Sequence, residues 1–260
     1  MPRTRRTART ARALAASAAA AVLLALTTGP ASARTTATTD ATADAPLPER
    51  MADTGGGSQL LTAEAPGTGS TTGRLTWWDR RGGRWVAAGS APARFGAGGL
   101  TDGATRVQGT STTPTGVYGL RYAFGTAPAP EGTRYGYRPV TEESWWCQDN
   151  GSSRYNRWVE PLPADCRPTE AERLAEYPTQ YSLALVIGYN YDRPVRGRGA
   201  GIFLHVDGAG ATAGCVSVPA EAMRAVLEWA EPARAPHIAI GTADGPTALT
   251  AVTRRSAVNR

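Results

Sequence analysis

The chain has 260 residues, of which 41% are hydrophobic and 19% charged, so a buried core can form and full disorder is excluded. Its net charge of +6 suggests a nucleic-acid partner, but five of the 28 basic residues, all of them arginines, lie in the first twelve positions. Beyond residue 33, 23 arginines face 22 acidic residues, and this near-neutral balance predicts no nucleic-acid partner.

Residues 1–33 are predicted to be a secretory signal peptide. An arginine-rich start precedes an apolar run over residues 14–26, which is shorter than the ~20 residues that a membrane-spanning helix needs. Ala31 and Ala33 fit a cleavage site, so the mature chain would begin at Arg34; an uncleaved anchor is the alternative. No later stretch is predicted to span a membrane, and we expect a secreted or wall-associated protein in an oxidising compartment.

One mainly-β domain is expected over residues 59–250. It is preceded by a flexible tether at 34–58, which is rich in small and polar residues, and followed by a fraying tail at 251–260. Apolar periodicity and turn residues define its elements. The predicted strands cover residues 72–78, 84–88, 106–108, 116–122, 182–189, 201–206 and 237–241, and the predicted helices cover residues 169–176 and 219–231.

Two of these predictions rest on local turn and cap chemistry. The Thr-Pro-Thr-Gly sequence at 113–116 predicts a tight turn, because proline presets φ and glycine permits the left-handed region. Thr169 followed by Glu172 predicts a capping box at a helix start. Residues 124–168 form a long irregular stretch, which is typical of a functional or cross-linked loop.

The three cysteines leave one thiol over when a disulfide forms. Cys147 and Cys166 lie in the same loop-rich stretch, and we expect them to form a disulfide that stabilises the fold by about 3 kcal/mol. The alternative, in which one of them pairs with Cys215, would remove the thiol with the best chemical surroundings.

Cys215 follows Gly214 and precedes the helix predicted at 219–231. Backbone N–H groups near a helix N-terminus favour negative charge, so we expect a lowered thiol pKa and a place for an oxyanion. His205 ends an apolar strand ten residues earlier and is a candidate general base. An inert buried cysteine and a core histidine bonded to the backbone are the alternatives.

Weaker candidates surround this pair. Asp207 lies on the same strand face as His205 and could orient the imidazole; alternatively it is a solvated turn residue and a backbone carbonyl orients the ring. Arg198 belongs to an arginine cluster that is either a solvated loop or a contact for a substrate carboxylate. His237 is interpreted as structural. The sequence predicts no metal site, because no acidic or cysteine cluster surrounds the two histidines.

These residues resemble the catalytic domain of the L,D-transpeptidase (YkuD-type) family. The stretches Ile202-Phe203-Leu204-His205 and Thr212-Ala213-Gly214-Cys215-Val216 are similar to its strand histidine and its Ser/Thr-His-Gly-Cys-apolar-Arg/Asn motif. The Thr-Pro-Thr-Gly-Val-Tyr sequence at 113–118 resembles its Thr-Pro-x-Gly-x-Tyr/Phe segment. The motif's second histidine is Ala213 here and its Arg/Asn is Ser217.

The resemblance spans roughly residues 105–242 and implies a β-sandwich-like catalytic domain with one or two short helices. It implies that Cys215 attacks a peptide bond in a peptidoglycan stem peptide, with His205 moving the proton, the backbone at Gly214 holding the oxyanion, and no cofactor. An amine of a second stem would capture the thioester to form a crosslink in cell wall biogenesis.

Two alternative functions and three candidate substrate-binding residues remain open. Capture of the thioester by water would make the protein an L,D-carboxypeptidase. Thr212, Asp207 and Arg198 are the candidates for substrate binding. A wall-binding module with an incidental thiol is the non-enzymatic alternative.

Overall fold

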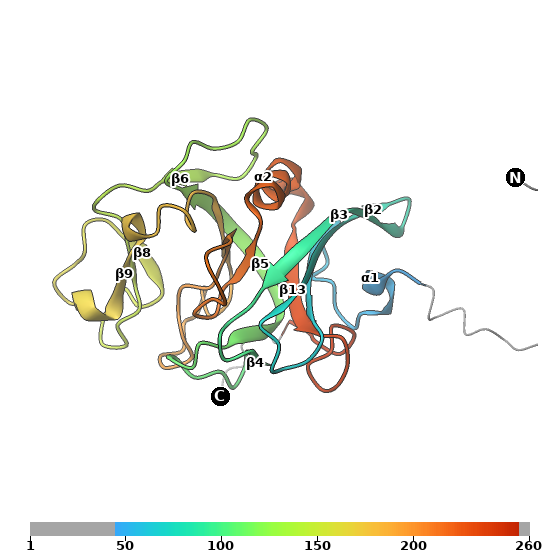
Figure 1. Cartoon of the computed structure of the whole chain (residues 1–260), viewed down its shortest axis with the longest axis horizontal. Coiled ribbons are helices and arrows are strands. Elements are labelled where there is room, and N and C mark those ends of the chain that lie inside the picture. The colour runs from blue at the N-terminus through green and yellow to red at the C-terminus, as the bar shows by residue number, and fades with distance from the viewer. Residues whose placement is uncertain (1–44, 255–260) are drawn as a thin grey trace, which may run out of the picture. The chain divides into compact units, whose positions relative to one another are not determined.

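The computed structural model describes residues 45–254 (Figure 1). The predicted signal peptide, residues 34–44 of the expected tether and residues 255–260 of the expected tail lie outside the described residues. The helices are α1 (Leu47–Arg50) and α2 (Ala220–Trp229), and the 3-10 turns are η1 (Pro168–Glu170), η2 (Leu174–Glu176) and η3 (Pro232–Arg234). The strands are β1 (Gln59–Ala65), β2 (Thr72–Arg81), β3 (Arg84–Arg94), β4 (Leu100–Asp102), β5 (Thr113–Gly125), β6 (Tyr137–Pro139), β7 (Trp145–Cys147), β8 (Arg157–Val159), β9 (Ala171–Arg173), β10 (Ala184–Ile187), β11 (Phe203–Val206), β12 (Val216–Val218) and β13 (His237–Thr242).

The main sheet has ten strands and closes on itself. Its order is β10-β11-β12-β3-β2-β1-β13-β5-β4, with β6 beside β5, and β10 also pairs with β5. The pairing between β12 and β3 is the shortest around this ring of strands, because Ser217 and Arg94 form its one pair in register. The predicted mainly-β, sandwich-like class is confirmed, and the closed path means that one sheet supplies both walls around the core.

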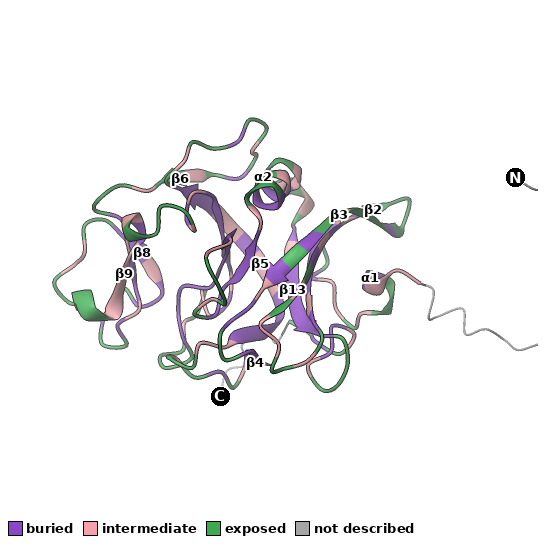
Figure 2. Cartoon of the chain, in the orientation of Figure 1, coloured by how far each residue is buried: buried purple, intermediate pink, exposed green. Residues whose placement is uncertain are grey.

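Helix α2 packs against the inside of this sheet. The predicted apolar stripe of Met223, Val226 and Leu227 is fully buried and joins Leu204 of β11 and Val216 of β12 in the largest hydrophobic cluster. Figure 2 shows buried residues along the central strands and on one side of α2. The helix thus supports β11 and β12 from the core side.

The first described residues pack on the face of β1 that points away from the main core. Leu47 of α1 and Met51 contact a second cluster that contains Leu60. The N–H of Ala52 donates to a backbone carbonyl of the C-terminal segment, at 3.1 Å. The flexible tether expected at 34–58 therefore differs from the structure over residues 45–58, where apolar packing and backbone hydrogen bonds hold the segment on the sheet.

A long excursion separates β5 from β10, and we call residues 126–183 the cover segment. It contains β6 and the small three-stranded sheet β8-β7-β9, which lie together at one side of the domain in Figure 1. Its aromatic residues Trp146, Trp158 and Tyr181 pack with Phe203 on the outer face of β11. The cover segment therefore forms a layer over the outer face of the sheet.

Two local predictions near β5 are wrong. Residues 113–116 do not form a tight turn: they begin the 13-residue strand β5, in which Thr113 and Pro114 pair in parallel with β4. Proline is tolerated there because it stands at the start of a strand. Residues 106–108 form a loop instead of the predicted strand.

The helix predicted at 169–176 is also wrong. Residues 171–173 form β9 and pair with β7, with η1 and η2 on either side. No side-chain hydrogen bond caps either turn. Glu172 instead accepts hydrogen bonds from Tyr181 and Gln148, so tertiary contacts have replaced the local cap.

Candidate active site

The structure places His205 on β11 and Cys215 immediately before β12, the strand that pairs with β11 in parallel. Leu204 of β11 pairs with Val216 of β12, and successive side chains of a strand point to opposite faces. His205 and Cys215, which flank this pair, therefore both point away from the core. Both line one cavity of about 570 Å³, whose far wall comes from the cover segment.

Cys215 stands in the loop before β12, and α2 begins only at Ala220, so the helix N-terminus expected beside the thiol is absent from this site. Its side chain is 7% exposed. The N–H of Phe203 donates to Sγ at 3.3 Å, and Sγ lies 3.3 Å from the carbonyl oxygen of Gly201. The sulfur is thus held by the backbone of β11 and of the residues just before it.

The lowered thiol pKa expected from the sequence is wrong. Burial is the largest effect and, together with the negative charge of Glu172, raises the pKa of Cys215 to about 12. The Phe203 N–H and the positive charge of Arg106 act in the opposite direction. The thiol is therefore protonated in the resting protein. A neighbouring base has to take its proton before the sulfur can act as a nucleophile.

His205 is 6% exposed and its Nδ1 lies 2.8 Å from the carbonyl oxygen of Val206. A carbonyl accepts only, so Nδ1 carries the proton and Nε2 keeps a lone pair. Burial is the main cause that lowers the pKa of His205 below 6.5, which keeps the imidazole neutral. A neutral ring with an unprotonated nitrogen is the form that accepts a proton from a thiol.

Asp207 does not orient this ring. Its Oδ1 accepts a 2.7 Å hydrogen bond from the Ser217 hydroxyl and lies 3.8 Å from Nε of Arg94. The backbone carbonyl of Val206 orients the imidazole instead, while the charge of Asp207 raises the pKa of His205 from a distance. Ser217 thus ties Asp207 to β12.

The turn that carries Cys215 is fixed by Thr212. Its hydroxyl donates to the Cys215 carbonyl at 2.7 Å and accepts from the Gly214 N–H at 3.1 Å. Gly214 has φ +137°, and a Cβ there would stand 2.8 Å from Nη2 of Arg106. Glycine is needed for this backbone, and its N–H, predicted as an oxyanion donor, holds the turn in the resting protein.

Arg106 is a site residue that the sequence reasoning missed. It is 5% exposed, its Nε donates to the Thr112 carbonyl at 2.7 Å, and its Nη1 donates to the Arg198 carbonyl at 2.9 Å. It lines the cavity, whereas the side chain of Arg198 is exposed and does not line it. No local pattern marks Arg106, because its second partner, the Arg198 carbonyl, lies 92 residues farther along the chain.

The opposite wall belongs to the cover segment. Tyr181 donates from its hydroxyl to Oε1 of Glu172 at 2.7 Å, and Gln148 donates from Nε2 to Oε2 at 3.2 Å. The Tyr181 ring also meets His205 edge to face, with centroids 5.5 Å apart. Burial raises the pKa of Glu172 above its usual value. A carboxyl group therefore lines the same cavity as Arg106.

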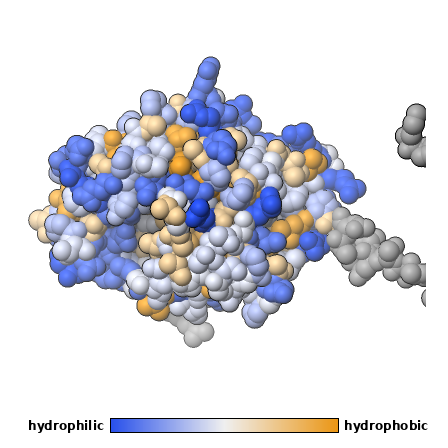
Figure 3. Space-filling model, in the orientation of Figure 1, coloured by the Kyte–Doolittle hydropathy of each residue, from blue (hydrophilic) through white to orange (hydrophobic). Residues whose placement is uncertain are grey.

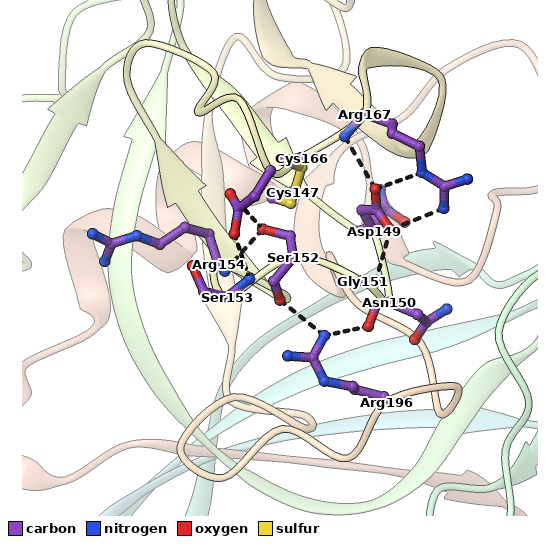
Figure 4. Close-up of polar contacts among 12 residues, drawn as sticks. Cys147, Asp149, Asn150, Gly151, Ser152, Ser153, Arg154, Cys166, Arg167 and Arg196 are labelled. Carbon is purple, nitrogen blue, oxygen red and sulfur yellow. Dashed lines mark hydrogen bonds and ion pairs between the residues drawn. A yellow bond between two sulfur atoms is a disulfide. The ribbon is translucent and has the colours of Figure 1, made fainter.

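A disulfide braces this wall. Cys147 and Cys166 are joined, as expected from the sequence, and Cys215 is free and buried. Arg167 forms a two-pronged ion pair with Asp149 at 2.7 and 2.9 Å, which holds the pKa of that carboxyl well below its usual range (Figure 4). Arg196 donates to the carbonyls of Asn150 and Ser152, tying the loop before β11 to the wall.

The outer surface of the cover segment, at the left of Figure 3, is mostly hydrophilic. Across residues 45–254, no group of three or more histidine, cysteine or acidic side chains is arranged to hold a metal ion. None of the helices in that part of the chain is long and apolar enough to cross a bilayer.

Comparison with known proteins gives one family. Residues 69–246 match the model of the YkuD family, described as the L,D-transpeptidase catalytic domain. Among solved structures, Bdellovibrio bacteriovorus Bd1075 is similar with a TM-score of 0.35 and 16% identity, over 71% of this chain and 48% of that chain. No curated protein matches the sequence.

Proposed function

Since this chain belongs to the YkuD family of L,D-transpeptidase catalytic domains, we propose that it is an exported acyltransferase that crosslinks peptidoglycan stem peptides through a thioester on Cys215. The observation that supports this most directly is the placement of Cys215 and His205 on one sheet face, lining one cavity. Both groups are neutral at rest, which suits a base that takes the thiol proton as the attack begins.

The first half-reaction forms the thioester. Nε2 of His205 takes the proton from Sγ of Cys215 while the sulfur attacks the peptide carbonyl carbon. The C–N bond then breaks, and the imidazolium returns its proton to the leaving amine of the D-amino acid. The N–H of Phe203 and the charge of Arg106, which both favour the thiolate, lower the free energy of the transient ion pair.

The tetrahedral intermediate needs donors for its oxyanion. Backbone N–H groups of the turn that ends at Cys215 are closest in the chain to the reacting sulfur. The Gly214 N–H can serve only by exchanging the Thr212 hydroxyl for the substrate oxygen. Thr212 is therefore proposed as a positioning residue of this turn.

The second half-reaction transfers the acyl group to an amine of a second stem peptide. Water in the place of the amine would give a carboxypeptidase product from the same thioester. A donor stem peptide, incubated with the protein with and without an acceptor stem and resolved by mass spectrometry, measures the ratio of the two products.

Replacement of the nucleophile tests the proposal as a whole. Cys215→Ala should lower both crosslinking and trimming by about 10⁴-fold or more, because no thioester can form. The assay is the mass-spectrometric product profile of a defined donor and acceptor pair, with thermal unfolding as the check on folding. Unchanged turnover in folded Cys215→Ala protein would overturn the proposal, because a group other than Cys215 would then carry the chemistry.

A further inference from the structure

Glu172 has no evident use in thioester formation. Its negative charge raises the pKa of Cys215, so it opposes the thiolate that the first half-reaction needs. Its structural partners are the hydroxyl of Tyr181 and the amide of Gln148, and both donate to it. Among the described residues, it forms no ion pair with an arginine or histidine. A carboxyl group placed against the nucleophile in this way calls for another explanation.

The two hydrogen bonds fit the ionised form of Glu172. One donor reaches each carboxylate oxygen, and an ionised carboxylate accepts at both oxygens. Burial works against that charge as long as no cation is near. A positively charged group that enters the cavity therefore stabilises the ionised form of Glu172, whose two oxygens already have hydrogen-bond donors.

In the thioester state, the negative charge of Glu172 no longer opposes a thiolate at Cys215. Once the sulfur is acylated it carries no charge, so a carboxylate at Glu172 no longer opposes it. The next reactant is an amine, which arrives in water as an ammonium ion. A carboxylate at Glu172 therefore complements the second substrate, whereas Arg106, which lines the same cavity, complements negative charge.

We propose that Glu172, held by Tyr181 and Gln148, is the acceptor subsite that binds the ammonium group of the incoming amine and receives its first proton. This inference rests on the proposed acyltransferase function and adds to it the residue that selects amine over water. Tyr181 contacts both Glu172 and His205, so it places the bound amine on the side of the general base.

The step balances as follows. The ammonium gives one proton to the Glu172 carboxylate, and the free amine attacks the thioester carbon. The amine nitrogen loses a second proton to Nε2 of His205 as the C–N bond forms. The C–S bond breaks, the sulfur takes that proton back from the imidazolium, and Glu172 releases its proton to solvent.

The test compares two acceptors on one donor. Hydroxylamine is a small nucleophile that is largely uncharged at neutral pH, while the side-chain amine of an acceptor stem is an ammonium. In Glu172→Gln, transfer to the stem amine should fall roughly 10- to 100-fold relative to transfer to hydroxylamine, because the hydrogen bonds to a charged group are lost. Thioester formation, followed as release of the D-amino acid in a single turnover, should not slow, because the charge that opposes the thiolate is gone, and hydrolysis should take the larger share.

Two controls keep the result specific. Glu176→Gln makes the same chemical change on an exposed residue outside the cavity and should leave the acceptor ratio as in the wild type. Tyr181→Phe removes one donor to Glu172 and should move the ratio in the same direction by a smaller factor. Glu172→Asp keeps the charge and should retain more preference for the stem amine than Glu172→Gln.

The outcomes separate the two proposals. An unchanged acceptor ratio in Glu172→Gln, with thioester formation intact, would overturn the acceptor subsite and leave the acyltransferase standing. An equal loss with both acceptors would assign Glu172 a structural role and would also overturn the inference. Failure of the wild-type protein to form any thioester would instead overturn the proposed function.

Discussion

The two faces of β11 and β12 carry different kinds of side chain. On the inner face, Leu204 and Val216 pack with the apolar stripe of α2. On the outer face, His205 Nδ1 and Cys215 Sγ each lie within hydrogen-bond distance of a backbone carbonyl. Two adjacent strands thus separate stability from chemistry by the alternation of their side chains alone.

Different physical properties matter on the two faces. The inner face depends on volume, because close-packed side chains lose free energy when a cavity opens. The outer face depends on where protons sit, because both reactive groups are buried and neutral. Substitutions on the two faces should therefore change different measured quantities.

The largest effect is expected on the outer face. In His205→Gln, thioester formation should slow by about 10²- to 10⁴-fold, because an amide cannot accept the thiol proton. The midpoint of thermal unfolding should change little, since the inner-face contacts of β11 remain. Single-turnover release of the D-amino acid measures the rate, and a rate equal to that of the wild type would show that His205 is not the base.

The next effect is expected on the inner face. Leu204→Ala should lower the free energy of unfolding by about 2–5 kcal/mol, because it opens a cavity beneath α2. Urea denaturation measures this, and acylation of Cys215 per folded molecule should stay within a few-fold of the wild type. Val86→Ala, on an exposed position of β3, is the control and should stay within about 0.5 kcal/mol.

The smallest effect concerns pH. His205 must be unprotonated to act, and burial lowers its pKa below 6.5, so kcat/KM should hold as pH falls through 6.5 and decline only below it. Asp207 raises the pKa of His205, so Asp207→Asn should shift this decline to still lower pH. A pH profile of donor turnover measures both, and a decline centred above pH 6.5 would contradict the buried neutral ring.

Much of the fold follows from sequence patterns that act locally. The helix α2, the strands β11 and β13 and the start of the hairpin of β2 and β3 agree with the sequence predictions, because alternation and the 3.6-residue period report which face is buried. Strand β3 continues to Arg94, beyond the predicted end at residue 88. The predictions that rest on isolated turn and cap residues, at 113–116 and at Thr169, are wrong. There, pairing with β4 and β7 outweighs the local preference.

The candidate site was only half visible in the sequence. Cys215 and His205 could be paired because His205 ends an apolar strand and Cys215 follows only ten residues later, after a glycine-containing turn. Arg106, Gln148 and Glu172 could not be found, since they reach the cavity from loops and from β9 through contacts between distant parts of the chain. The direction of the Cys215 pKa also depends on burial, which sequence order does not report.

The cover segment leaves and rejoins the sheet at neighbouring points. Phe124 of β5 pairs with Ala184 of β10, so residues 126–183 begin and end side by side. Because Gln148, Glu172 and Tyr181 all come from this one excursion, the wall that faces the second substrate is encoded in a single stretch of the gene. If the proposed acceptor wall is correct, changes confined to that stretch would alter which acceptor is bound and would leave Cys215 and His205 in place on the main sheet.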